Sequence, residues 1–162
     1  MVKSNYCRTG IRMKKIFAAA LSLLISSSVF SGHHEDLNIK EIKTNYQAYV
    51  DDFINKDFKA IANHFQAPMM QRTEEGMIVS DTPADISQRY RNYMENIQDG
   101  YKYSTVNRLD VTKLSSSLYY ADADYSRFNS KDEVLHHGRS IYFFSNADGG
   151  WKIFSMEEVE RR

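Results

Sequence analysis

Cysteine is almost absent from this chain of 162 residues, and the single one, Cys7, lies near the amino terminus. A disulfide framework, a zinc–thiolate site and a catalytic thiol are therefore excluded for the rest of the chain. Acidic residues are absent before Glu35, which is the first of 21. The basic start of the chain thus differs in charge from the remainder.

The amino-terminal segment has the three parts of a secretory signal peptide: basic residues, an apolar run at 16–25 and then small residues. The apolar run is shorter than the roughly 20 residues that span a membrane as a helix. A signal anchor that stays in the membrane is the alternative, and the polar run Ser26-Ser27-Ser28 disfavours it. Val29 and Ser31 suit the positions before a cleavage site. We therefore expect a signal peptide at 1–31, cleavage before Gly32 and a secreted or periplasmic protein.

A second methionine lies within this segment. Met13 is followed directly by two lysines, so residues 1–12 are interpreted as a possible upstream mis-start. Residues 32–37 are then expected to form a short flexible stretch after the cut. A chain that begins Gly32-His33-His34 offers an amine, two amides and an imidazole to Cu(II) or Ni(II). The alternative is a polar terminus that binds no metal.

Charge excludes two classes of partner. Five of the 21 basic residues and none of the 21 acidic residues lie in 1–31, so the remainder carries a net charge of −5. Nucleic acids and anionic membrane surfaces both require basic patches, so neither is an expected partner after cleavage.

No two histidines of the predicted domain have metal-ligand spacing, and no cofactor is expected. About 130 residues suffice for one domain with a core of its own.

Hydrophobic periodicity predicts helices in the first half of the remaining chain. Apolar residues recur at spacings of three and four over 39–53, with Asn38 as the expected N-cap. Asp57 is expected to cap a short second helix that ends near Phe65. The sequence Thr82-Pro83-Ala84-Asp85 has the capping hydroxyl, first-turn proline and acidic third residue that typically start a helix. Gly100 is expected to end that third helix.

The second half alternates with a period of two, which indicates strands. A short hairpin is expected over 68–80, and longer strands are expected at 101–112, 118–128, 134–145 and 151–156, joined by short turns. Asn107 is expected to share one strand face with Leu109. Ile141-Tyr142-Phe143-Phe144 places apolar bulk on both faces of its strand. A second subunit could cover one of these faces, so a homodimer is expected.

Three helices followed by a meander that ends in Gly150-Trp151-Lys152-Ile153 resemble the nuclear transport factor 2-like superfamily, and its SnoaL-like branch in particular. The resemblance covers 38–160. It implies an α+β fold in which a cone-shaped, curved antiparallel sheet wraps around the N-terminal helices (cystatin-like) and leaves a pocket at its open end. The superfamily includes isomerases, dehydratases and non-catalytic binding modules, so the fold does not decide the function.

Aromatic residues on the helical stripes and on the strands are the candidate pocket lining. The expected ligand-binding residues are Tyr46, Tyr49, Phe53, Tyr90, Tyr93, Tyr125 and Tyr142. A wall of this kind suits a small, largely apolar ligand with one or two polar groups.

Asp122 and Asp124 are the weak candidates for catalysis, because residues two apart on a strand share a face. Paired carboxylates in a pocket can perform acid–base chemistry. The alternative, which we favour, is that Ala121, Ala123 and Tyr125 face inward. The two aspartates would then form ion pairs on the outer face, with Arg108 or Arg139 from neighbouring strands.

Histidines supply a second set of candidates. His136 and His137 are adjacent on a predicted strand, so they point to opposite faces and cannot ligate one ion together. His136 is a weak candidate for a general base. His64, at the end of the second helix, is expected to interact with the helix dipole.

Three functions remain open from the sequence. The first is an exported module that binds a small hydrophobic molecule without chemistry. The second is an isomerase or dehydratase that works by proton transfer. The third is a dimerisation or interaction domain whose cone is filled by side chains.

Overall fold

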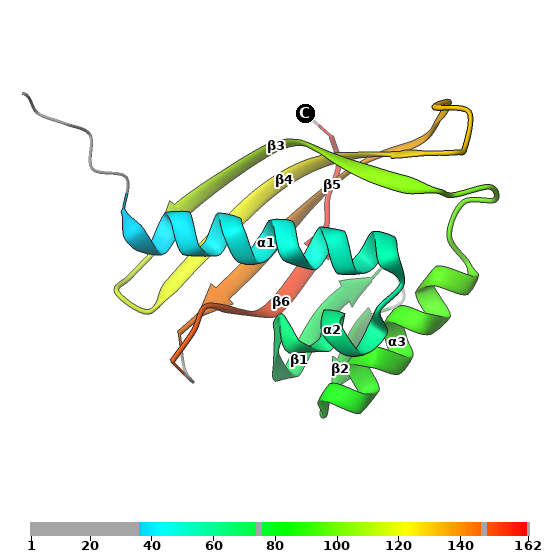
Figure 1. Ribbon diagram of the computed structural model, residues 1–162. Coiled ribbons are helices and arrows are strands. Elements are labelled where there is room, and N and C mark those ends of the chain that lie inside the picture. Colours follow the sequence, from blue (N-terminus) through cyan, green and yellow to red (C-terminus); the bar gives the residue numbers. More distant parts are fainter. Residues whose placement is uncertain (1–35, 74–75, 147–148, 162) are drawn as a thin grey trace, which may run out of the picture. The chain divides into compact units, whose positions relative to one another are not determined.

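The computed structural model describes residues 36–73, 76–146 and 149–161, and over these ranges the chain forms three helices and six strands (Figure 1). The helices are α1 (Leu37–Asn55), α2 (Phe58–Asn63) and α3 (Pro83–Glu95). The strands are β1 (Phe65–Thr73), β2 (Gly76–Ser80), β3 (Tyr103–Lys113), β4 (Leu118–Phe128), β5 (Val134–Ser145) and β6 (Lys152–Glu158). None of the described helices is long and apolar enough to cross a membrane. The predicted α+β class is confirmed.

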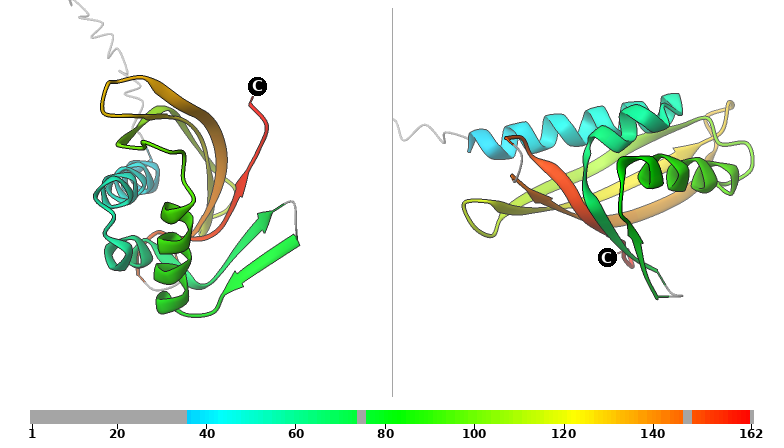
Figure 2. Two further views of the ribbon diagram at one scale, coloured as in Figure 1. Left: turned by 90° about the vertical axis from the view of Figure 1, so that its right-hand side faces the viewer. Right: turned by 90° about the horizontal axis from the view of Figure 1, so that it is seen from below.

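The six strands form one curved sheet in the order β2-β1-β6-β5-β4-β3. Figure 2 shows that the sheet bends around the helices without closing. The predicted curved sheet is confirmed, and four of its five strand pairs are antiparallel as expected, whereas β1 pairs with β6 in parallel and makes the sheet mixed. The parallel pair joins the earliest strand to the latest one, and such a distant pairing leaves no trace in local periodicity.

The start of α3 is confirmed as predicted. The backbone N–H of Asp85 donates to Thr82 Oγ1 at 3.2 Å, and the N–H of Thr82 donates back to Asp85 Oδ2 at 2.9 Å. Pro83 occupies the first turn, where its missing N–H costs nothing. The predicted end at Gly100 is wrong, since α3 stops at Glu95.

The predicted cap of α1 is also wrong. Asp36, rather than Asn38, is the N-cap, and its Oδ1 accepts a hydrogen bond from the Asn38 backbone N–H at 3.0 Å. Both residues have the capping chemistry. Asp36 is held by a further contact, since its Oδ2 accepts a hydrogen bond from the Tyr119 hydroxyl at 2.8 Å. That contact with β4 is tertiary and cannot be seen in a local pattern.

A stripe of α1 packs against the concave face of the sheet, the face that is turned toward the helix (Figure 2). Its fully buried members include Ile42 and Tyr46, and β4, β5 and β6 contribute Tyr119, Phe144 and Ile153. Truncating a buried aromatic such as Phe144 to alanine is expected to cost about 3–5 kcal/mol. This packing fixes α1 across the sheet.

A bulge at Asn107 changes which residues of β3 face inward. The register between β3 and β4 shifts there, so Val106 lies opposite Tyr125 while Leu109 lies opposite Ala123. The prediction that Asn107 and Leu109 share a face is therefore wrong, because one extra residue in a strand reverses the alternation beyond it. Val106 and Leu109 both reach the concave face as a result.

Candidate functional site

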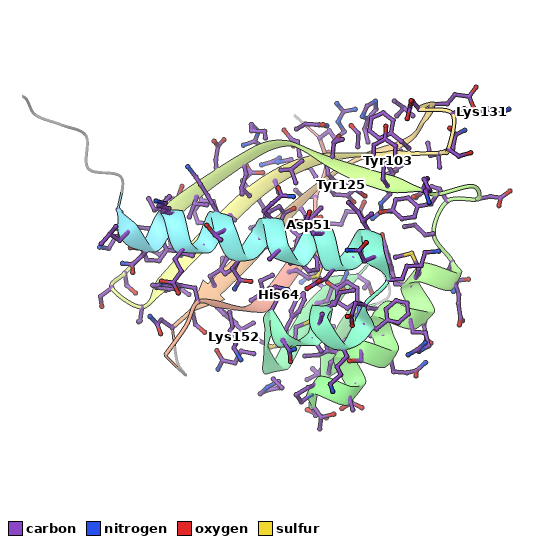
Figure 3. The ribbon with its side chains drawn as sticks, in the orientation of Figure 1. Asp51, His64, Tyr103, Tyr125, Lys131 and Lys152 are labelled. Carbon is purple, nitrogen blue, oxygen red and sulfur yellow. The ribbon has the colours of Figure 1, made fainter. Side chains whose placement is uncertain are left out.

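A cavity of about 1170 Å³ lies among α1, α3 and the concave face of the sheet. All seven aromatic residues predicted to bind ligand line it, namely Tyr46, Tyr49, Phe53, Tyr90, Tyr93, Tyr125 and Tyr142. Figure 3 shows Tyr125 in the part of the sheet that lies above the second half of α1 in this view. The cavity is large enough for a drug-sized molecule, so the cone is not filled by side chains.

Two tyrosine hydroxyls in the cavity wall, those of Tyr49 and Tyr90, bond to each other. The Tyr90 hydroxyl donates to Met156 Sδ at 3.4 Å, so the Tyr49 hydroxyl, 3.0 Å from it, is the donor to Tyr90. The ring of Tyr142 packs beside them, with its centroid 5.0 Å from that of Tyr46 and 5.9 Å from that of Tyr49. Burial raises the pKa of Tyr46, Tyr49 and Tyr90 well above the usual value for tyrosine. These side chains are therefore neutral at working pH.

A buried arginine accompanies the aromatic residues. Arg127 on β4 is only 6% exposed and lines the cavity. Its Nη1 donates to Gln98 Oε1 at 2.9 Å and its Nη2 to the Tyr93 hydroxyl at 2.6 Å, whereas its Nε has no hydrogen-bond partner among the described residues. An always-charged group in such a place is costly to bury.

Arg127 is not among the predicted site residues, although one signal could have found it. It shares strand parity with Ala123 and Tyr125, the face expected to point inward. Both Ala121 and Ala123 are fully buried on that face. A cation on the inward face of a predicted strand is unusual, because arginine is rarely buried without a partner.

Asp122 and Asp124 lie on the opposite, convex face, away from the cavity. Asp122 accepts hydrogen bonds from Arg139 at 2.8 Å and from Arg108 Nη2 at 2.9 Å, and Asp124 accepts from Arg108 Nε at 2.7 Å. The hydrogen bond from Arg139 outweighs burial and, with Arg108, lowers the pKa of Asp122 to about 2. The two carboxylates therefore act as ion-pair partners in the sheet.

The two strand histidines point to opposite faces, as their adjacency requires. His137 contacts Ser126 Oγ at 2.8 Å on the convex face. His136 lies opposite Arg127 on the concave face, with Nε2 buried and 3.7 Å from Glu158 Oε1. Burial, reinforced by the Arg127 charge, lowers the pKa of His136, so its ring is neutral near pH 7.

His64 lies outside the cavity, where α2 leads into β1 (Figure 3). Its Nε2 is 2.7 Å from Asp52 Oδ2, and its Nδ1 contacts Asn45 Oδ1. The Asn45 amide nitrogen donates to the Trp151 carbonyl, which fixes the orientation of the amide. His64 thus joins α1 to the turn before β6, a more specific role than the expected interaction with the helix dipole.

Charged residues mark the rim of the cavity. Asp81, Asp85 and Glu158 contribute acidic side chains, and Arg89 contributes a second cation. Arg89 is half-buried, and its Nε and Nη2 both donate to Gln71 Oε1, at 3.0 and 2.7 Å. The wall is therefore aromatic within and charged at its edge.

In the described part of the chain, no group of three or more His, Cys, Asp or Glu residues is arranged to hold a metal ion. The expected Gly32-His33-His34 site lies outside the described residues, as do the predicted signal peptide and its cleavage site.

Solved structures with the same fold come from several bacteria. A domain of unknown function with a cystatin-like fold from Nostoc punctiforme PCC 73102 is 14% identical, with a TM-score of 0.64 over 79% of this chain and 80% of that chain. Aln2 from a Streptomyces species is 15% identical, with a TM-score of 0.63 over 78% and 92%. An NTF2-like protein of unknown function from Shewanella oneidensis MR-1 is 11% identical, with a TM-score of 0.59 over 75% and 98%.

At these identities the structural likeness establishes the fold alone. No curated protein shows significant sequence similarity to the chain. The sequence model of one family, described as NTF2-like protein (DUF6841), matches residues 40–161, which include nearly all of the helices and strands described above. The chain therefore belongs to this family of NTF2-like proteins.

Proposed function

We propose that this domain is exported, resembles the SnoaL-like branch, and binds a small, largely apolar molecule in its cone without transforming it. The observation that carries the proposal is the aromatic cavity of about 1170 Å³, in which Tyr46, Tyr49 and Tyr90 are neutral and the hydroxyls of Tyr49 and Tyr90 bond to each other. Aromatic walls supply apolar contact, worth roughly 25 cal/mol per Å² buried. The hydroxyls supply a few polar contacts that orient the ligand.

The position of the acidic residues supports binding over catalysis. Asp122 and Asp124 are bound to arginines on the convex face, so they are out of reach of a molecule in the cone. General acid–base catalysis requires a group within hydrogen-bonding reach of the substrate and with a pKa near the working pH. The buried tyrosines do not meet the second condition.

Binding is tested by filling the cavity. Val106 lines it from β3, so Val106→Trp should remove space for a ligand. Val134→Trp, at the exposed start of β5, makes the same change outside the cavity and is the matched control. With naphthylmethanol as the probe in calorimetry, the Val106 variant should lose binding by at least about tenfold, while the control should match the wild type. Equal binding by all three proteins would refute the proposal.

A proton-transfer enzyme is the second candidate, and one observation favours it. His136 is neutral, its buried Nε2 has no hydrogen-bond partner among the described residues, and Glu158 lies 3.7 Å away. A neutral imidazole beside a carboxylate has the properties of a general base.

Deuterium separates the two candidates. A ligand recovered with the protein from its own compartment is identified by native mass spectrometry and then incubated with the protein in deuterated water. An isomerase or dehydratase should either exchange a ligand proton for deuterium or convert the ligand into a different molecule. His136→Gln should abolish both the exchange and the conversion. A ligand recovered unchanged and without deuterium supports the binding module.

A further inference from the structure

Arg127 is a buried cation without an acidic partner. In the part of the chain that the structure describes, no carboxylate oxygen lies within 4.0 Å of its guanidinium nitrogens, although the group is only 6% exposed. The arginines of the convex face differ in this respect, since Arg108 and Arg139 both bind Asp122. A buried charge normally has a counter-charge, because the cost of removing it from water is several kcal/mol.

The donors of Arg127 are only partly used. A guanidinium has five N–H groups, and those that bond here go to the neutral oxygens of Gln98 and Tyr93. Its Nε is buried without a partner among the described residues. An unpaired buried donor is unfavourable, so the described residues do not satisfy this guanidinium on their own.

Aromatic rings hold the guanidinium in place. The rings of Tyr125, Tyr93 and Phe53 lie 5.0, 5.3 and 5.8 Å from Arg127 Cζ. Contacts of this kind are favourable, but they neutralise no charge. These rings also line the cavity, so a ligand that touches them lies beside the cation.

The charges around the cavity favour a ligand with a single negative charge. His136, opposite Arg127, is neutral near pH 7. Asp81, Asp85 and Glu158 lie in the wall and repel further negative charge. Arg127 is the buried cation of the cavity, whereas Arg89 is half-buried at the rim and donates to Gln71. A single buried cation among these groups matches a monoanion better than a phosphate monoester, which carries close to two charges.

We propose that Arg127 binds the carboxylate of a monocarboxylic acid whose apolar body lies against the aromatic wall of the cavity. This inference rests on the proposed function and narrows its ligand class. The planar guanidinium matches a carboxylate in geometry. Gln98 and Tyr93 each accept from one terminal nitrogen of Arg127, so the remaining N–H groups of Nη1 and Nη2 supply the donors to the carboxylate.

Calorimetry with three probes of one shape tests the ligand class. The probes are naphthoate, naphthylmethanol and naphthyl phosphate at pH 7.5. The wild type should bind naphthoate at least about tenfold more tightly than naphthylmethanol, since a hydrogen bond to a charged group contributes roughly 1.5–3 kcal/mol. Naphthyl phosphate should bind more weakly than naphthoate.

Substitutions of single arginines test whether Arg127 causes the preference for naphthoate over naphthylmethanol. Arg127→Gln should bind naphthoate and naphthylmethanol with affinities within about threefold of each other, and Arg127→Lys should retain part of the preference. Arg91→Gln removes the same charge from the exposed side of α3 and should retain all of it. Circular dichroism checks folding. If Arg127→Gln does not fold, the Arg127 Nε resonance of the wild type should shift when naphthoate is added.

Each outcome bears on one proposal. Equal affinity of the wild type for the acid and the alcohol would overturn the carboxylate site and leave the apolar binding function standing. Tighter binding of the phosphate, loss of the preference in Arg89→Gln but not in Arg127→Gln, or an unmoved Arg127 Nε resonance would also overturn it. Failure of both naphthoate and naphthylmethanol to bind would remove the proposed function as well.

Discussion

The ring of Tyr125 lies over Gly138, its partner on β5, so closely that a Cβ at position 138 would fall 2.2 Å from Tyr125 Cζ. The absence of a side chain at this one position allows the tyrosine to lie flat on the sheet. From there it contacts the Arg127 guanidinium and forms part of the cavity wall.

Gly138→Ala should therefore turn the Tyr125 ring away from the sheet. We expect a loss of about 1–3 kcal/mol in the free energy of unfolding, as for other overpacked sites, together with weaker binding of naphthylmethanol. In a Tyr125→Leu background the added methyl has a smaller neighbour, so its cost should largely vanish. Urea unfolding of the four proteins measures this coupling. Equal costs in the two backgrounds would contradict the close approach.

Asp122 should be important for stability and unimportant for binding. Its side chain is 6% exposed and bound by two arginines. Arg108 keeps Asp110 and Asp124 as partners in Asp122→Asn, whereas Arg139 loses its carboxylate partner among the described residues, so the substitution should cost about 1–3 kcal/mol. Asp110→Asn is the matched control, since Asp110 also contacts Arg108 but is exposed, and such pairs contribute at most about 1 kcal/mol. Probe affinity at the temperature where both variants are folded should be unchanged. Loss of binding in a folded Asp122→Asn protein would place Asp122 in the site.

The ionised Asp122 carboxylate should also make the free energy of unfolding depend on pH in the acid range. The pKa of Asp122 is about 2 in the folded protein and about 3.9 when unfolded. Its contribution to stability is therefore fully present above about pH 4 and is lost as the pH falls toward 2. Urea unfolding at pH 3 and pH 7 should show a smaller difference for Asp122→Asn than for the wild type. An unchanged difference would mean that other groups cause the acid sensitivity.

The convex face should hold two subunits together. Tyr120, Phe143 and Phe154 place their rings there in one row, with centroids 6.4 and 6.2 Å apart. We expect Phe143→Glu to split a homodimer without unfolding the monomer, because a charge buried at an interface is costly. Lys131→Glu, at the β4–β5 turn, is the control. Sedimentation at micromolar concentration measures the oligomeric state of the wild type and both variants. A monomeric wild type would refute the prediction.

Export should remove the basic segment. We expect the mature protein to begin at Gly32, since Val29 and Ser31 satisfy the cleavage rule. Amino-terminal sequencing of the exported protein measures this directly. Detection of residues 16–25 in the soluble mature protein would contradict it.

A free Gly32 should also bind Cu(II) through Gly32-His33-His34, and one residue added before it should abolish that binding.

Local chemistry allowed several elements to be predicted. The start of α3 rests on residues within one turn of each other, and the bounds of β4 and β5 rest on alternation along single strands. Periodicity also placed the seven aromatic residues on helical stripes and strand faces, and the resemblance to the nuclear transport factor 2-like superfamily implied that these faces line a pocket. These features depend on neighbours in the sequence.

The remaining features depend on contacts between distant residues. Asp36 caps α1 with support from Tyr119, which lies 83 positions away in the chain. The bulge at Asn107 places its amide on Ser126 of β4, at 2.6 Å, and has no marker in the sequence of β3. Arg127 lies on the same strand face as Ala123 and Tyr125, so strand alternation places it inward. Its charge would normally assign it to the solvent-exposed face instead.

The position of β6 determines when the cone exists. It pairs with β1 on one side and with β5 on the other, so it joins the early hairpin to the later meander, and it contributes Met156 and Glu158 to the cavity wall. A nascent chain that has not yet released β6 from the ribosome therefore holds two separate sheet fragments. The cavity is complete only after β6 has paired with β1 and β5, so a premature stop codon within β6 would leave a chain with most of its residues but without the complete cavity.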